Sequence, residues 1–313
     1  MIILVIGGTG LVGNAMRRIL DETETTHECV YLSSKDYDLT NYDECDKCFN
    51  DHKPDIVIHL AANVGGLFKN LNYKVDMFET NMSMNTNVLK ACHKNNVSKC
   101  VSCLSTCIFP NDTTYPIDET MLHNGPPHYS NDAYAYAKRM VDVQSQAYHD
   151  QYNKMFVSVI PTNIYGPQDN FHLEDSHVIP ALIHQCYLAK KGFRPFIVRG
   201  TGKPLRQFIY SDDLAILILK VALCYEDKEP IILSVPEKDE VSIENVAKII
   251  SKKMDYENNL YFDNHYSDGQ YKKTANNNKL MKWLNAPFEF TPIEVGLERT
   301  IDWFIENYET LRK

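Results

Sequence analysis

The sequence predicts an α/β protein with a Rossmann-type, doubly wound parallel sheet and a smaller mixed α/β substrate-binding domain. Two observations carry this prediction. The chain begins with a short apolar run that leads directly into a glycine-rich turn, and short apolar runs then alternate with longer amphipathic stretches as far as Gly166. Alternating β and α units of this length are typical of a parallel sheet covered by helices, whose ligands bind at the carboxyl ends of the strands.

The first apolar run, Ile2 to Ile6, is too short to span a membrane and predicts a buried strand. It continues into the turn Gly7-Gly8-Thr9-Gly10-Leu11-Val12-Gly13, and residues 11–20 have the spacing of an amphipathic helix. Backbone N–H groups of such a turn can approach a pyrophosphate at the N-terminus of the helix. The turn is therefore predicted to bind a dinucleotide, with an ordinary tight turn as the alternative.

The end of the second strand, Cys29 to Leu32, indicates which dinucleotide binds. A carboxylate at this point would bind the ribose 2′-OH of NAD. This chain instead has Ser33-Ser34-Lys35, with no acid before Asp36. Hydroxyls and a cation suit a 2′-phosphate, so we expect NADP(H). The alternative is that Lys35 is a solvated surface residue.

Further strands and helices are predicted along the chain, and they divide it into two domains. Strands are expected at 56–62, 99–104 and 156–160, and helices at about 76–95 and from the Tyr134 segment to about 152. Beyond Gly166, prolines interrupt the pattern, and helices recur near 178–190, 214–224, 243–253 and 292–307. We predict a nucleotide-binding domain at 1–165, joined again by about 206–225, and a substrate-binding domain made of 166–205 and 226–313.

Tyr134 and Lys138 are four residues apart and therefore lie on one face of a helix. An ammonium beside a phenol lowers the pKa of the phenol, which would make Tyr134 an acid/base group near neutrality. Ser105 can hold a carbonyl oxygen against Tyr134, and the set suits hydride transfer at a ketone or alcohol. Cys107 adds a soft base beside the same carbonyl. Chemistry beyond simple reduction is therefore expected.

Composition agrees with a globular enzyme and excludes several other classes. The 313 residues are 44% hydrophobic and 23% charged, and the net charge of −9 argues against nonspecific nucleic-acid binding. Nine cysteines without a signal-peptide start indicate a reducing compartment, so a cytoplasmic protein without a membrane segment is expected. Cys45 and Cys48 have the spacing of a metal-ligand pair, but no second pair stands at zinc-finger spacing, so no metal is expected.

Several longer segments carry a more specific resemblance. They are the turn at 7–13, His59-Leu60-Ala61-Ala62, Val64-Gly65-Gly66-Leu67, Ser105-Thr106-Cys107-Ile108-Phe109-Pro110, Tyr134 to Lys138, Pro161-Thr162-Asn163-Ile164-Tyr165-Gly166-Pro167, Asp169-Asn170-Phe171, Ser176-His177-Val178-Ile179-Pro180 and Arg206-Gln207-Phe208-Ile209-Tyr210. Through them the chain resembles the extended short-chain dehydrogenase/reductases, and among these the GDP-L-fucose synthases, over essentially its whole length. The Ser-x-Cys and Ser-His-Val-Ile-Pro segments are the narrowest signals.

The resemblance implies conversion of GDP-4-keto-6-deoxy-D-mannose to GDP-L-fucose, by epimerisation at C3 and C5 and then NADPH-dependent reduction of the C4 ketone. It implies Cys107 as base and His177 as acid on opposite faces of the sugar. A thiol and an imidazole of ordinary pKa both lie within reach of neutral pH. Tyr134 and Ser105 would donate to O4, and Lys138 would hold the cofactor ribose. A small buried Cys107 and a helix-capping or core His177 are the alternatives.

The resemblance also implies contacts with both ligands. Beyond the glycine turn, the cofactor contacts would be Ser33, Ser34, Lys35, Asp38, Leu39, Ala61, Ala62, Lys138, Pro161, Thr162, Asn163, Ile164 and His177. The GDP-sugar contacts would be Asn163, Val178, Leu182, Gln185, Arg199, Arg206 and Asp268. Relatives carry a cation at the position of Gln185 and often Trp at that of Arg199, whereas the Arg206 guanidinium suits diphosphate oxygens. Asp268 as a solvated loop residue is the alternative.

Relatives pair through helices at the sheet edge, including the Tyr134 helix, so the resemblance implies a homodimer. The alternative functions are another sugar-nucleotide epimerase or dehydratase, and a noncatalytic NADP-binding sensor. Dehydratases place an Asp-Glu pair where Thr106 and Cys107 stand, and a 4-epimerase needs no thiol there. Noncatalytic relatives usually lose the Tyr or the Lys, and both are present.

Overall fold

The computed structural model describes residues 1–23, 26–266, 268 and 270–311. Its main sheet has six strands in the order β10-β5-β4-β3-β1-β2, and all neighbouring strands are parallel. The strands are β1 (Ile2–Ile6), β2 (Glu28–Leu32), β3 (Ile56–His59), β4 (Lys99–Cys103), β5 (Met155–Pro161) and β10 (Ile231–Leu233). The chain builds outward from β1 in both directions. The point between β1 and β3, where the direction reverses, is where such sheets bind dinucleotides.

Helices cover both faces of this sheet. One layer contains α2 (Tyr42–His52), α4 (Lys74–Lys94) and α5 (Asp132–Tyr152), and the other contains α1 (Leu11–Asp21) and α7 (Ser211–Cys224). Alternate residues of β1 pack against the two helix layers, because successive side chains of a strand point to opposite faces of the sheet. Leu4 and Ile6 pack in the first core, and Ile3 and Val5 pack in the second. The doubly wound parallel sheet predicted from the sequence is therefore confirmed.

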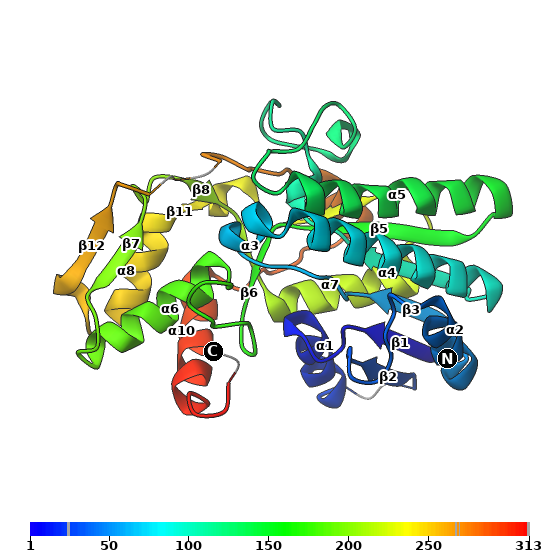
Figure 1. The fold of residues 1–313 in the computed structure, drawn as a ribbon, viewed down its shortest axis with the longest axis horizontal. Coiled ribbons are helices and arrows are strands. Elements are labelled where there is room, and N and C mark those ends of the chain that lie inside the picture. The colour runs from blue at the N-terminus through cyan, green and yellow to red at the C-terminus, as the bar shows by residue number, and fades with distance from the viewer. Residues whose placement is uncertain (24–25, 267, 269, 312–313) are drawn as a thin grey trace.

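A smaller part lies beside the sheet, on the left of Figure 1. It holds α6 (Val178–Lys190), α8 (Ile243–Lys253) and α10 (Ile293–Glu306), whose apolar faces share a third core. Its strand pairs are β7 (Phe196–Arg199) with β12 (Leu260–Asp263), and β8 (Leu205–Arg206) with β11 (Val241–Ser242). A further parallel pair is formed by β6 (Asn163–Tyr165) and β9 (Phe208–Tyr210), and β6 comes directly after β5 in the chain. The remaining helices are α3 (Leu67–Asn72) and α9 (Asn278–Leu284), with short 3₁₀ turns such as η1 (Thr106–Ile108) and η2 (Glu119–Met121).

One segment departs from the predicted domain limits. The sequence assigns 226–313 to the substrate-binding domain, but β10 lies in this range and pairs with β5 in the main sheet. The three residues of β10 are fully buried and apolar, and they extend the sheet past β5. Three residues are too few to show a hydrophobic period. The sequence of β10 therefore does not indicate which sheet this strand joins.

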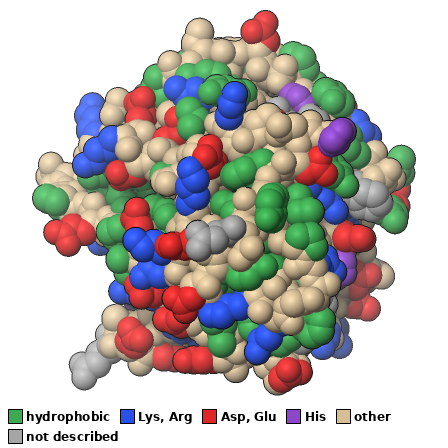
Figure 2. Space-filling view, turned by 90° about the vertical axis from the view of Figure 1, so that its left-hand side faces the viewer, with side chains coloured by type: hydrophobic (Ala, Val, Ile, Leu, Met, Phe, Trp, Pro, Cys, Tyr) green, Lys and Arg blue, Asp and Glu red, His purple; other side chains and the backbone are tan. Residues whose placement is uncertain are grey.

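The surface of the smaller part carries acidic and basic side chains interspersed around apolar groups (Figure 2). Within the described ranges, no helix is long and apolar enough to cross a membrane. The same residues hold no group of three or more His, Cys, Asp or Glu placed to bind a metal ion. Cys45 and Cys48 belong to α2, and their side chains are fully buried in the core between this helix and the sheet.

Candidate active site

The glycine turn between β1 and α1 is closely packed and open to a ligand. Gly7 has a φ of +81°, which favours glycine, and a Cβ on Gly13 would lie 2.5 Å from the backbone of Gly8. The first residues of α1 therefore lie directly on the turn. At Gly10 no side chain caps this helix, so the N–H groups of its first turn remain available to an anion. This arrangement fits a dinucleotide pyrophosphate.

The carboxyl ends of β3 and β5 lie at the same edge of the sheet as this turn. A Cβ on Gly7 would lie 2.7 Å from the Ala61 nitrogen, so the turn touches the segment after β3. Beyond β5, the Thr162 N–H donates to the Leu233 carbonyl at 3.2 Å, and the Asn163 side-chain amide donates to the Gln207 carbonyl at 3.0 Å. Residues 61–62 and 161–164, predicted to touch the cofactor, thus follow strands at the same edge of the sheet as the glycine turn.

The end of β2 differs from expectation in one respect. The Ser33 N–H and hydroxyl both donate to the Asp36 carboxylate at 2.7 Å, and the Lys35 N–H donates to the Ser33 Oγ at 3.2 Å. The two bonds from Ser33 lower the pKa of Asp36, which is therefore charged at neutral pH. The Asp36 carboxylate is therefore bonded to Ser33, which is predicted to contact the 2′-phosphate of NADP. Lys35 and backbone N–H groups must offset the negative charge of this carboxylate for the phosphate to bind.

Ser105 and Cys107 follow β4, at the carboxyl edge of the sheet. Ser105 begins the η1 turn, and its Oγ accepts the Cys107 N–H at 3.4 Å. Burial raises the pKa of the Cys107 thiol, and the positive charge of Lys273, Ser105 and then Lys138 oppose this rise. The expectation of an ordinary thiol pKa is wrong for the described structure, because the side chain is largely removed from water.

Tyr134 and Lys138 lie one turn apart on α5 and are both buried. The Lys138 ammonium donates to the Cys103 carbonyl at 2.9 Å, at the end of β4. Burial raises the pKa of the Tyr134 phenol well above its usual value, and Cys107 and Cys103 add to this rise. The predicted lowering by Lys138 is therefore wrong here, because the phenol is removed from water and the Lys138 ammonium does not act measurably on its charge. Tyr134 is a neutral phenol, the form that donates a proton.

His177 is the N-cap residue of α6, and its side chain makes no capping hydrogen bond. The helix-capping alternative is therefore wrong. The His177 side chain is exposed, so the core alternative is wrong as well. The protein around the imidazole nevertheless lowers its pKa by desolvation. The segment before it is held by the loop after β3, since the Gly66 N–H donates to the Asp175 carbonyl at 3.0 Å. Val178, Leu182 and Gln185, predicted to contact the sugar nucleotide, follow on α6.

Several groups predicted to contact the nucleotide already have protein partners. Arg206 donates to the carbonyls of Leu205 at 2.7 Å and Gln270 at 2.6 Å. The two Asp268 oxygens accept the N–H and the hydroxyl of Thr201, each at 2.7 Å. The Arg199 guanidinium lies over the Tyr266 ring, 4.9 Å from its centroid. These bonds leave free donors on Arg206, because a guanidinium has five N–H groups.

Lys273 is a site residue that the sequence does not reveal. Lys273 is far from Cys107 and Arg206 in the chain, but its positive charge interacts with both groups in the folded protein. Its segment is fastened to the loop after η1, since the Ile117 N–H donates to the Thr274 carbonyl at 2.8 Å and the Tyr115 hydroxyl to the Lys272 carbonyl at 2.7 Å. Nothing in the Lys272-Lys273 dipeptide distinguishes it from a solvated pair.

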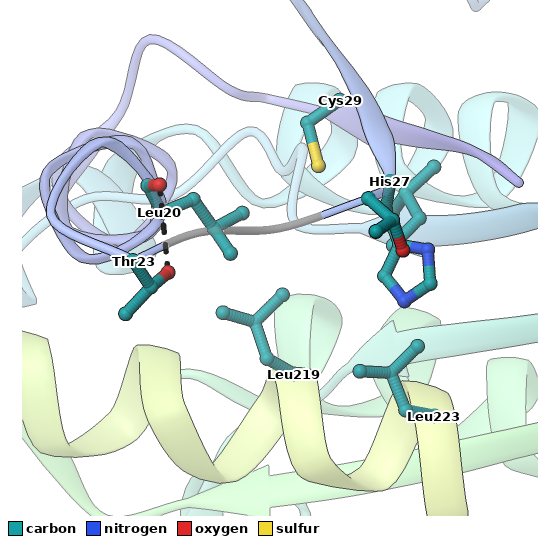
Figure 3. A pocket seen from close by; sticks show the side chains of 8 residues that line it. Leu20, Thr23, His27, Cys29, Leu219 and Leu223 are labelled. Carbon is teal, nitrogen blue, oxygen red and sulfur yellow. Dashed lines mark hydrogen bonds between the residues drawn. The ribbon is translucent and has the colours of Figure 1, made fainter.

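A separate cavity of about 270 Å³ lies between α1, β2 and α7 and is lined by Leu20, Thr23, His27, Cys29, Leu219 and Leu223, among others (Figure 3). It opens near the amino ends of β1 and β2. The glycine turn and Cys107 are at the opposite, carboxyl edge of the sheet, so this cavity is not part of the candidate site.

The fold and the site define a dinucleotide-dependent enzyme of the short-chain dehydrogenase/reductase type. Residues 3–235 match the model of the NAD dependent epimerase/dehydratase family. The chain is 54% identical to a GDP-L-fucose synthase of Dictyostelium discoideum, covering 99% of this chain and 97% of that one. It is 50% identical to a probable GDP-L-fucose synthase of Drosophila melanogaster, covering 99% of both. A crystal structure of a GDP-L-fucose synthetase from Naegleria fowleri bound to NADP is 46% identical, with a TM-score of 0.94 over 100% of this chain and 96% of that chain. The chain belongs to the NAD dependent epimerase/dehydratase family and, within it, to the GDP-L-fucose synthases.

Proposed function

We propose that this protein converts GDP-4-keto-6-deoxy-D-mannose into GDP-L-fucose, by epimerisation at C3 and C5 followed by NADPH-dependent reduction at C4. The observation that carries the proposal is the Cys107 thiol, two residues beyond Ser105 and electrostatically coupled to Tyr134. Reduction alone needs only a Ser, Tyr and Lys set. A base beside that set suits proton removal from carbons next to the same carbonyl.

The epimerisation follows from the acidity of the protons on C3 and C5, which both flank the C4 ketone. Cys107 in its thiolate form takes the proton from one carbon and then from the other, and between these steps the thiol loses its proton to solvent and His177 regains one from solvent. Ser105 and Tyr134 donate hydrogen bonds to O4, where negative charge develops as the proton leaves. His177 returns a proton to the opposite face of the ring, which inverts the carbon. The cations around the thiol, Lys273 and Lys138, favour its charged form.

The reduction uses the same oxygen-binding groups. NADPH, when bound, supplies the hydride for C4. Tyr134 gives its proton to O4, and its raised pKa keeps the phenol protonated until that step. Lys138 bonds to the Cys103 carbonyl and is proposed to contact the cofactor ribose as well.

The proposed cofactor site consists of the glycine turn 7–13, the segments 33–35, 38–39, 61–62 and 161–164, and Lys138 with His177. The proposed sugar-nucleotide site consists of Asn163, Val178, Leu182, Gln185, Arg199, Arg206 and Asp268. Its nucleotide groups come from β7, β8 and the segment after β12, with Gln185 from α6. Arg199 and Arg206 are the cations of this set, and they suit the two negative charges of a diphosphate.

We propose a homodimer formed through α4 and α5. These helices make extensive contact with each other and cover one face of the sheet. Large apolar side chains are nevertheless exposed along them, among them Val75, Phe78, Tyr136 and Val143. Exposed apolar groups gathered on one surface are typical of an interface between subunits. A cytoplasmic location is proposed because all nine cysteines are free thiols.

The proposal is tested by product analysis after incubation with GDP-4-keto-6-deoxy-D-mannose and NADPH. The expected product is GDP-L-fucose, with one NADPH oxidised per molecule formed. A product reduced at C4 but unchanged at C3 and C5 would show a simple reductase. Unreduced epimers accumulating in the presence of NADPH would show an epimerase without the second stage.

A further inference from the structure

Arg139 follows Lys138 on α5 and is almost fully buried. Its Nε donates to the Ile108 carbonyl at 3.1 Å, and its Nη2 donates to the same oxygen. Its Nη1 donates to the Gly125 carbonyl at 2.9 Å. Burying a guanidinium is costly, so a site that does so gains something specific from it.

Together with Lys138, these bonds form a clamp, in which two neighbouring residues of α5 hold the two ends of the 103–108 turn. Lys138 holds the Cys103 carbonyl at 2.9 Å, and Arg139 holds the Ile108 carbonyl. Ser105 and Cys107 lie between these two anchored positions. Consecutive residues of a helix point about 100° apart, so one helix can reach both ends of the turn at once.

Tyr134 lies on the same helix. The clamp therefore fixes the thiol that takes protons from carbon relative to the phenol that binds O4.

We propose that Arg139 is a positioning residue for epimerisation, which holds Cys107 in register with Tyr134, while hydride transfer depends little on it. The inference rests on the proposed function. Lys138 already fixes the beginning of the turn near Tyr134, so loss of Arg139 releases the end that carries Cys107.

Two rates separate this role from a general effect on folding. Epimerisation is measured as solvent deuterium entering C3 and C5 of the keto sugar. Hydride transfer is measured as NADPH formed from GDP-L-fucose and NADP⁺, the reverse of the second stage, which needs Tyr134 and Lys138 but no proton removal from C3 or C5. The ratio of the two rates does not depend on how much of the enzyme is folded.

For Arg139→Met we expect epimerisation to fall about 100-fold, as for a reacting group misplaced by about 1 Å, with a much smaller loss of hydride transfer. Arg139→Lys keeps the positive charge, but an ammonium cannot reach both the Ile108 and Gly125 carbonyls as the planar guanidinium does. Its ratio of epimerisation to hydride transfer should therefore lie between those of Arg139→Met and wild type. Alkylation of Cys107, followed by peptide mapping, should be faster in Arg139→Met, because the end of the turn that carries the thiol is no longer held.

Arg18→Met is the matched control. Arg18 donates to Gln168 at 2.6 Å and Asp212 at 2.5 Å, away from the thiol, so its loss should leave the ratio unchanged. Tyr136→Leu provides a second route if the Arg139 variants do not fold. The exposed Tyr136 ring lies 5.5 Å from the Arg139 guanidinium, and its loss should lower the ratio in the same direction.

A ratio that stays at the wild-type value in Arg139→Met, or in Tyr136→Leu where only that variant folds, would overturn the inference. Wild-type enzyme that introduces no deuterium at C3 and C5 would instead contradict the proposed function. The two failures are therefore distinguishable.

Discussion

The backbone of Gly66 lies directly against Ser176: a Cβ on Gly66 would lie 2.9 Å from the Ser176 carbonyl oxygen. The Gly66 N–H also donates to the Asp175 carbonyl at 3.0 Å. The loop after β3 therefore fixes the two residues that precede His177, and this contact needs a residue without a side chain.

Gly66→Ala should slow epimerisation about tenfold or more, because the added methyl displaces the 175–176 backbone and with it His177. The measurement is deuterium entry at C3 and C5 by NMR. Gly125→Ala is the control, since a Cβ there would meet only the Pro110 side chain, at 3.4 Å from its Cβ and 3.9 Å from its Cγ. Equal rates in Gly66→Ala and Gly125→Ala would show that the contact does not position His177.

Tyr134→Phe should separate the two stages. Hydride transfer needs a proton at O4, so reduction should fall by about 10²–10⁴-fold, the usual contribution of a positioned acid. Proton exchange at C3 and C5 should remain detectable, because Cys107 and Ser105 stay in place. NADPH oxidation and deuterium exchange are measured on the same preparation, and equal losses in both would contradict separate roles.

The cofactor preference should depend on the turn after β2. Ser33→Asp with Lys35→Ala adds a second carboxylate beside Asp36 and removes a cation, so NADPH binding should weaken far more than NADH binding. The ratio of kcat/KM for the two cofactors measures this effect. Lys47→Ala, a change at another exposed lysine, is the control. An unchanged ratio in the double variant would move the selective group elsewhere, for example to Arg17 on α1.

The pH dependence of epimerisation should have a broad plateau. Burial raises the pKa of Cys107, and the protein around the exposed His177 side chain lowers the pKa of its imidazole. The reaction needs the thiolate and the imidazolium together. As pH rises between the two pKa values, the thiolate fraction increases as much as the imidazolium fraction decreases. The kcat/KM for epimerisation should therefore fall only below the His177 pKa and above the Cys107 pKa.

Lys273→Met tests the cause of this profile. Removing the cation should raise the pKa of Cys107 further, which moves the alkaline limb to higher pH and lowers the plateau. An epimerisation rate that instead rises about tenfold per pH unit throughout would show that only the base titrates and that His177 is not the acid.

The sequence predicts those parts of the fold that have a local signal. The apolar run and glycine turn mark β1 and the start of α1, and the predicted helices at 178–190 and 243–253 coincide with α6 and α8. β10 was assigned to the wrong domain, because three buried residues do not indicate which sheet they join. Cys45 and Cys48 resemble metal ligands in spacing, yet they are core residues of α2.

The proposed catalytic groups are recognisable because their chemistry requires particular residue types at short spacings, as with Ser105 and Cys107 or Tyr134 and Lys138. The groups proposed to position these residues, or to favour their charged forms, are not recognisable from the sequence. Arg139 and Lys273 look like solvated cations in the sequence, and their roles arise only when distant segments meet at Ile108 and Cys107. The raised pKa of Tyr134 likewise depends on burial, which the helical spacing does not reveal.

The most direct test of the central claim, that Cys107 is the base at both carbons, is the deuterium content of product formed in deuterated water. Wild-type enzyme should give GDP-L-fucose with deuterium at C3 and C5. Cys107→Ser keeps Tyr134, Lys138 and the ketone in place, but a hydroxyl is a far poorer base than a thiol. It should therefore slowly give the C4-reduced sugar with the original configuration and little deuterium at either carbon. Doubly deuterated GDP-L-fucose formed by Cys107→Ser at an undiminished rate would show that Cys107 is a structural residue.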